Sequence, residues 1–223
     1  MRILAEEKKN RTDQLLLTAP VSVWKVILGK YLSMVTIYAI PVVISAFYPL
    51  IMGRYGVISY PMAYVAVIGF FFLGCAQIAV GLFLSSVTES QVIAAVLTFG
   101  ILFCSYMMDG IESFFSDTAV SSMVAFLILA VVLGIVVYQL TKNIIFSSCV
   151  GGVLVIVVAA VYFIKPTIFT GLIQKFLNLF AIANHFDNFV GGIFDVTGII
   201  YMLSVVCIFV FLTVQCIQKR RWS

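Results

Sequence analysis

Residues 62–84 read MAYVAVIGFFFLGCAQIAVGLFL and contain no charged side chain. An α-helix rises about 1.5 Å per residue, so about 20 apolar residues cross the hydrocarbon core of a bilayer, which is about 30 Å thick. The run is continuously apolar and lacks the alternation of polar and apolar residues that a lipid-facing barrel strand shows. The stretch therefore predicts a membrane-spanning helix.

Five further stretches have the same character, and none of them contains Asp, Glu, Lys, Arg or His. They are residues 31–52, 91–108, 119–140, 144–164 and 198–217. Several connections are short, such as Thr141–Asn143, so the helices that they join must run antiparallel. The sequence predicts an all-α fold, a polytopic membrane helix bundle of about six transmembrane helices.

The composition supports the same environment. Hydrophobic residues make up 63% of the 223 residues and charged residues 10%, whereas a soluble domain carries about 25% charged residues. With one histidine and no C-x2-C pair, the chain shows no metal-ligand spacing, and we expect no cofactor. The basic residues form no stripe, so we expect the lipid bilayer, and not nucleic acid, as a partner.

Basic residues are distributed unevenly along the chain. With six spans both termini lie on one side of the membrane, and that side would carry ten Lys and Arg residues. The other side would carry three, Arg54, Lys165 and Lys175. Because positively charged loops stay in the cytoplasm, this asymmetry predicts that both termini are cytoplasmic.

Two segments lie outside the predicted spans. Residues 1–30 are predicted to be a cytoplasmic segment with a helical hairpin on the membrane, ahead of five helices within 31–164. Residues 165–197 are predicted to be an extracytoplasmic amphipathic or re-entrant segment, because Phe169, Leu172, Phe176 and Phe180 recur at helical spacing. Residues 198–223 then form the last transmembrane helix and a cytoplasmic tail.

The spans contain no ionisable acid, base or histidine, and this bears on the source of energy. Ion-coupled carriers usually retain such groups inside the membrane, although each costs about 2.5–3.5 kcal/mol at a helix centre. Their absence disfavours proton relays and leaves sodium coupling through neutral oxygens as a weaker alternative. If the protein moves a substrate uphill, the energy must enter from outside the membrane.

Energy could be received at two features on the cytoplasmic side. One is the predicted hairpin, with acidic residues and the Leu15–Leu17 run, and the alternative for it is a simple juxtamembrane anchor. The other is the turn at residues 85–91, where the alternative for Glu89 is a solvated carboxylate or a helix cap.

Small and polar residues recur on one face of each of the second and third spans. Such stripes permit close helix packing, and a polar one can instead line a substrate pathway. We expect either helix packing or a pathway role for Gly74, Gln77, Gly81, Ser85, Ala94, Thr98 and Ser105.

Four stretches together resemble the permeases of ABC-2-type transporters. The most specific is AEEKKNRTDQLLLTAPVS at residues 5–22, followed by GLFLSSVTESQ at 81–91. HFDNF at 185–189 and FLTVQ at 211–215 fit the region around the last helix of that family. The match is similar to the branch that contains gliding-motility and nitrous-oxide-accessory permeases.

The resemblance implies a subunit that docks on an ATP-binding subunit and moves a substrate, as an exporter in a bacterial cell membrane. It also implies a second permease subunit, in a homodimer or a heterodimer, and ATP hydrolysis on the partner and not on this chain. The residues expected to contact the ATP-binding subunit are Glu6, Glu7, Asp13, Leu15, Leu16, Leu17, Thr18, Pro20 and Glu89.

The family places two membrane helices before the segment that begins here at Ala5, so we expect the first two helices to be lacking. The alternative function is therefore a non-transporting assembly or regulatory component with a permease-like fold.

Overall fold

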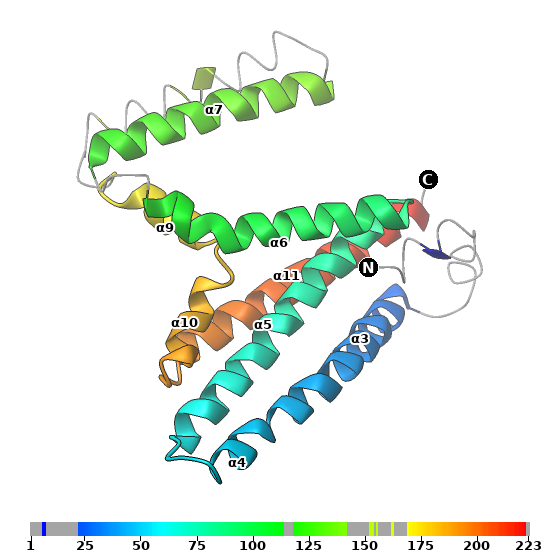
Figure 1. Cartoon of the computed structure of the whole chain (residues 1–223). Coiled ribbons are helices and arrows are strands. Elements are labelled where there is room, and N and C mark those ends of the chain that lie inside the picture. The colour runs from blue at the N-terminus through cyan, green and yellow to red at the C-terminus, as the bar shows by residue number, and fades with distance from the viewer. Residues whose placement is uncertain are drawn as a thin grey trace. The chain divides into compact units, whose positions relative to one another are not determined.

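The computed structural model describes residues 6–7, 22–113, 118–141, 152–153, 155, 162 and 169–221. Helices dominate these residues, and no strand occurs among them, which confirms the all-α prediction. The helices are α3 (Val23–Ser45), α4 (Tyr48–Met52), α5 (Tyr60–Val87), α6 (Gln91–Ser113), α7 (Ala119–Thr141), α9 (Leu172–Asn178), α10 (Asn184–Val190) and α11 (Val196–Arg221), as labelled in Figure 1.

The chain divides into two compact units. The first unit comprises residues 1–106 and 182–223, and it contains α3, α4, α5, α10, α11 and most of α6. The second comprises residues 107–181, with α7 and α9 in contact with each other. In the second unit the Ser122 hydroxyl accepts a hydrogen bond from the backbone N–H of Ile173, which ties α9 to α7.

Four of the predicted membrane spans are present as helices long and apolar enough to cross a bilayer. They are Val23–Met52, Tyr60–Val87, Gln91–Met108 and Val196–Lys219. The span predicted at 119–140 coincides with α7. The span predicted at 144–164 lies outside the described residues except for four positions.

The first span begins earlier than the predicted residue 31. Residues 23–30, which we assigned from the sequence to the segment ahead of the spans, form the first two turns of α3. The physical reason is that Val23 and Ile27 are buried against Val210 and Val214 of α11, so this stretch gains by continuing the helix.

In the predicted segment 165–197, the apolar residues at helical spacing enter a helix only from Leu172 onward. Gly171 adopts a positive φ of 68°, a conformation that glycine tolerates, and α9 begins only after it. α10 follows as a second short helix and ends before Gly191, and Gly192 takes a φ of 77°.

Helix α5 is the centre of the first unit, because α3, α10 and α11 all contact it. Its glycines admit aromatic side chains from two neighbours. A Cβ atom at Gly74 would lie 2.2 Å from the Tyr38 ring of α3, and one at Gly69 would lie 2.5 Å from the Phe189 ring of α10. The Tyr38 hydroxyl also donates to the backbone oxygen of Phe70 at 2.8 Å.

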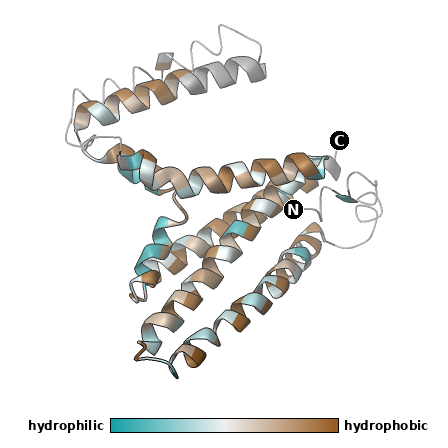
Figure 2. Cartoon of the chain, in the orientation of Figure 1, coloured by the Kyte–Doolittle hydropathy of each residue, from teal (hydrophilic) through white to brown (hydrophobic). Residues whose placement is uncertain are grey.

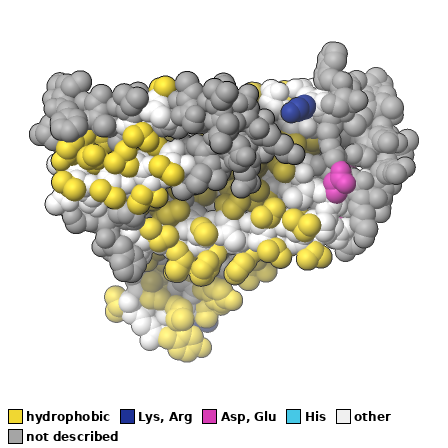
Figure 3. Space-filling model, turned by 90° about the horizontal axis from the view of Figure 1, so that it is seen from above, with side chains coloured by type: hydrophobic (Ala, Val, Ile, Leu, Met, Phe, Trp, Pro, Cys, Tyr) yellow, Lys and Arg dark blue, Asp and Glu magenta, His cyan; other side chains and the backbone are white. Residues whose placement is uncertain are grey.

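The outward faces of the helices are apolar. In Figure 2 the membrane-length helices are mostly brown, and on the face in Figure 3 hydrophobic side chains are frequent while few charged ones interrupt the described surface. On α6 the exposed side chains include Val92, Val96, Phe99, Phe103 and Tyr106. Such surfaces suit contact with lipid or with another membrane helix.

The first span is interrupted once. Helix α3 ends at Ser45, a turn occupies Ala46 and Phe47, and α4 begins at Tyr48. Pro49 lies in the first turn of α4, where its missing N–H removes no helical hydrogen bond.

Candidate coupling site

The first turns of α3 lie beside the last turns of α11. Val23 and Ile27 of α3 belong to the same buried cluster as Val210 and Val214 of α11. The Trp24 ring contacts the Phe211 ring, with the centroids 5.9 Å apart. The N-terminal end of α3 and the C-terminal end of α11 therefore share one end of the first unit.

The C-terminal end of α5 lies at this end too. Ala79 and Leu82 of α5 join the same buried cluster. Closer to the helix end, the Cys216 thiol of α11 donates to the backbone oxygen of Ser86, with 3.6 Å between the two atoms. The turn that joins α5 to α6 therefore lies beside the end of α11.

That turn is shorter than the predicted 85–91 loop. Helix α5 continues to Val87, Thr88 is extended, and α6 begins at Gln91. The backbone oxygen of Ser90 accepts from the N–H of Ala94 at 3.0 Å, which closes the first turn of α6. Glu89 is exposed at the tip, beside a hollow of about 300 Å³ that residues 89–92 line. The turn can thus present a carboxylate to a protein that docks there.

Two of the predicted contact residues at the start of the chain are described. Glu6 and Glu7 are helical and half-buried, and the Glu7 carboxylate accepts a hydrogen bond from the Lys30 ammonium group in an ion pair. The ion pair fixes Glu7 against the second turn of α3. The other predicted contact residues in this segment, Asp13, Leu15, Leu16, Leu17, Thr18 and Pro20, lie outside the described residues.

The predicted small-residue stripe of α5 lies largely inside the first unit. Gly74, Gly81 and Ser85 are buried, and Gln77 is half-buried. Since Gly74 abuts the Tyr38 ring, its lack of a side chain is what lets α3 approach α5 there.

The stripe of α6 is buried at all three predicted positions. Ala94 and Thr98 are fully enclosed, and Ser105 is 8% exposed. The Thr98 hydroxyl donates to the Ala94 carbonyl of its own helix at 2.7 Å. The Ser105 hydroxyl accepts from the backbone N–H of Ile182 at 3.1 Å. Both hydroxyl groups therefore have partners within the protein.

The opposite end of α11 is held by a polar cap. Asp195 accepts from the Asn188 amide at 2.8 Å and from the backbone N–H of Thr197 at 2.9 Å. The hydrogen bond from Asn188, followed by backbone donors, holds the pKa of the Asp195 carboxyl below its ordinary value. Nearby, the His185 ring stacks on Tyr201 with centroids 3.8 Å apart. These contacts fix α10 against the start of α11.

Sequence reasoning missed two partners that build the site. Lys30 was given no partner in the sequence analysis, and it pairs with Glu7, which is 23 positions away. Ser86 was treated as part of a turn, but its carbonyl ties α5 to α11. The opposite charges of Glu7 and Lys30 are compatible with the first pair, whereas nothing in the sequence indicated the second.

In the described part of the chain, no group of three His, Cys, Asp or Glu side chains is arranged to hold a metal ion. What the site offers is a set of helix ends, one exposed carboxylate and an ion pair, and these features are suited to binding a protein.

The fold defines a multi-pass helical membrane protein. Residues 1–120, more than half of the chain, match the model of the ABC-2 family transporter protein, so the chain belongs to that family and is a permease component of an ABC transporter. Membership implies an ATP-binding partner. No curated protein and no solved structure matches the chain.

Proposed function

We propose that this chain is the permease half of an exporter, in which ATP hydrolysis on a separate subunit drives substrate movement. In this proposal the ATP-binding subunit docks at the end formed by the start of α3, the α5–α6 turn and the end of α11. The observation that carries the proposal is the convergence of these three elements at one end of the first unit.

Orientation follows from charge. Lys25, Lys30 and Lys219 belong to this end, whereas Arg54 lies beyond the other end of α3. Since Lys and Arg accumulate on the cytoplasmic side, the docking end faces the cytoplasm of a bacterial cell in this proposal, together with both termini.

The orientation has a direct test. In a cysteine-free background, Ser90→Cys and Val57→Cys place one thiol in each of two connections at opposite ends of α5. A membrane-impermeant maleimide added to intact cells should label Cys at 57 and spare Cys at 90. The reverse pattern would place the docking end outside, where no ATP-binding subunit could reach it.

Residues 6–22 are the proposed coupling element, with Glu89 as a second contact. Glu7 is already fixed to α3 through Lys30, so a push on this segment acts on the first span. The test is co-purification of the ATP-binding subunit with the wild type and with a Leu15→Asp, Leu16→Asp variant. We expect both recovery and stimulated ATPase activity to fall for the variant.

A matched control is available at the opposite end. Tyr55 and Val57, in the connection between α4 and α5, are strongly exposed apolar residues, and Tyr55→Asp, Val57→Asp introduces the same two charges there. This control should retain the partner. Equal recovery of the partner by the control and the Leu15→Asp, Leu16→Asp variant would refute the docking assignment. ATPase activity of the chain alone would refute the proposal that a separate subunit hydrolyses ATP.

A second permease subunit is proposed to pack on α6. Val92, Val96, Phe99, Phe103 and Tyr106 are exposed and follow spacings of four and three residues alternately, which is the heptad pattern of paired helices. The Phe99 and Phe103 rings stack on each other with centroids 5.9 Å apart. These five exposed side chains therefore share one side of α6, apart from the buried small residues of that helix.

Disulfide cross-linking tests this pairing. In a cysteine-free background, Phe99→Cys should form a cross-linked pair of chains in native membranes. Ile101→Cys, which is also exposed but lies on another side of α6, should not. Equal yields at both positions would remove the support for α6 as the contact.

A further inference from the structure

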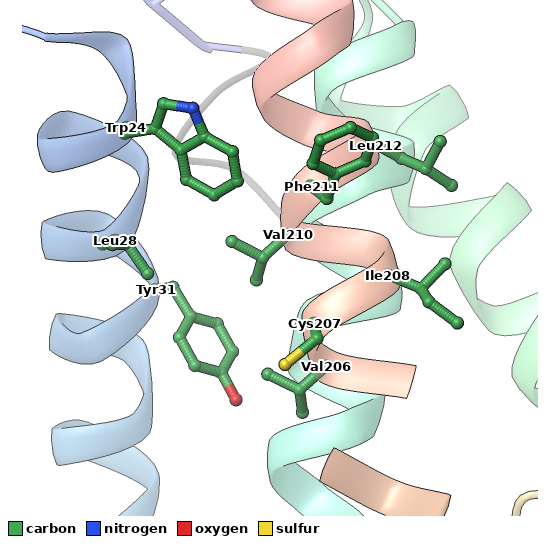
Figure 4. Close-up of a pocket in the computed structure, with 9 residues that line it drawn as sticks. All are labelled: Trp24, Leu28, Tyr31, Val206, Cys207, Ile208, Val210, Phe211 and Leu212. Carbon is green, nitrogen blue, oxygen red and sulfur yellow. The ribbon is translucent and has the colours of Figure 1, made fainter. Parts of the chain in front are cut away.

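An open groove runs between the first turns of α3 and the middle turns of α11. Trp24, Leu28 and Tyr31 line it on α3, and residues 206–208 and 210–212 line it on α11 (Figure 4). Its volume is about 520 Å³, within the range of about 300–1,000 Å³ that is usual for small-molecule sites. Trp24 and Phe211 extend toward each other at one end of it.

The lining of the groove suits only an apolar ligand. Tyr31 and Val210 form a buried floor, while Leu28 and Ile208 are exposed at its sides. The Tyr31 hydroxyl, a polar group in the lining, donates to the backbone oxygen of Cys75 at 3.2 Å, so it is directed into the protein. The groove is therefore apolar and open to the surroundings of the helices.

The length of the groove argues against a helix as its occupant. The seven-residue step from Trp24 to Tyr31 measures about 10 Å along α3. A helix that crosses the membrane beside it would run along about 30 Å of hydrocarbon, three times that length. A segment of a single acyl chain matches the groove in both length and polarity.

Positive charge lies at the end marked by Trp24. Lys25 is exposed on the first turn of α3, and Lys219 is exposed on α11, eight residues beyond Phe211. Lys219 follows Ile208 by eleven residues, about three full turns of 3.6, so it lies on the Ile208 side of α11, and Lys25 is the basic residue next to Trp24. Indole and ammonium groups are the side chains that occupy the headgroup layer of a bilayer.

We propose that the groove binds one anionic glycerophospholipid from the surrounding bilayer. One acyl chain lies between α3 and α11, and the phosphate of the headgroup lies near Lys25. The proposal rests on the apolar lining, the short length and the positive mouth, and it is independent of the coupling function.

Tryptophan fluorescence gives the test, because the chain has two tryptophans, Trp24 and Trp222. In a Trp222→Phe background, Trp24 reports contact with brominated acyl chains, which quench indole fluorescence. The full-length protein is reconstituted in phosphatidylcholine vesicles with a small fixed fraction of brominated phosphatidylglycerol or of phosphatidylcholine with the same brominated chain. We expect stronger quenching by the brominated phosphatidylglycerol.

Two variants and two controls sharpen the result. Lys25→Gln should lower the relative affinity for phosphatidylglycerol about five-fold, the equivalent of about 1 kcal/mol per basic residue at a membrane surface. Cys207→Phe should fill the groove and remove the preference. Arg54→Gln and Ile40→Phe, which make matched changes outside the groove, should leave it unchanged.

Several results would overturn the proposal. Equal quenching by the two brominated lipids would show that the site does not select an anionic lipid. A preference that survives Lys25→Gln would remove the headgroup assignment, even if Cys207→Phe fails to fold. Protection of Trp24 from both lipids, relieved by diluting the protein in the bilayer, would show that a second copy covers the groove.

Discussion

Helices α5 and α6 have a similar apolar composition and different surroundings. Both are apolar and both carry a stripe of small residues. Half of the most apolar 18-residue stretch of α5 is buried inside the protein, whereas only 17% of the corresponding stretch of α6 is buried. On α5, Gly74 and Gly69 receive the rings of Tyr38 and Phe189, whereas a Cβ atom at Gly100 of α6 would meet nothing within 4 Å. A small residue thus indicates a possible close approach, and the neighbouring helix decides whether the approach occurs.

The largest expected effect contrasts two phenylalanines. Phe189 is fully buried against Gly69 of α5, and Phe99 is exposed on α6. Phe189→Ala leaves a cavity and should cost about 3 kcal/mol, the lower end of the usual range because lipid, unlike water, also solvates the ring. Phe99→Ala should cost less than about 0.5 kcal/mol. Reversible unfolding in mixed micelles measures both, and similar losses would break the contrast between the helices.

A smaller effect is expected from adding one methyl group. Gly74→Ala places a Cβ atom against the Tyr38 ring and should cost about 2 kcal/mol through overpacking. Gly100→Ala should be neutral or slightly stabilising, because alanine favours the helix and has space there. Thermal unfolding in the same micelles gives the comparison. If Gly74→Ala were neutral, the close approach of α3 to α5 would be incorrect.

The smallest effect separates two hydroxyl groups of α6. Ser105→Ala removes the acceptor for the N–H of Ile182 and should cost about 1 kcal/mol. Thr98→Val removes a bond to a carbonyl that already serves its own helix, so the cost should be below about 0.5 kcal/mol. The same unfolding assay applies. A larger loss for Thr98→Val would indicate that this hydroxyl faces something other than its own backbone.

The parts of the fold that could be predicted are those that depend on length and polarity. The third span was predicted at residues 91–108, and the described helix supplies a span at Gln91–Met108. A run of apolar residues that matches the bilayer thickness leaves little choice of structure, since each backbone N–H must find a partner within the helix. The start of α9 depends on a positive φ at Gly171, and one glycine among apolar residues does not indicate that conformation.

The candidate site was predictable only in part. Glu89 was placed in a connection between spans, and it lies exposed in one. The pairing of Glu7 with Lys30 and the bond between Cys216 and Ser86 join residues 23 and 130 positions apart. Contacts at such separations depend on how helices pack, and helix packing in a membrane depends on local shape, which hydropathy does not encode.

The interruption at Ala46 and Phe47 leaves the length of the first span intact. Helix α3 contains 23 residues and is therefore a rod about 35 Å long. Ala46 and Phe47 keep right-handed helical dihedral angles, and α4 follows them directly, so the whole stretch Val23–Met52 is long enough to cross a bilayer despite the interruption. The roughly 35 Å of α3 alone already exceed the hydrocarbon thickness of about 30 Å, so α4 extends the span toward the layer of lipid headgroups.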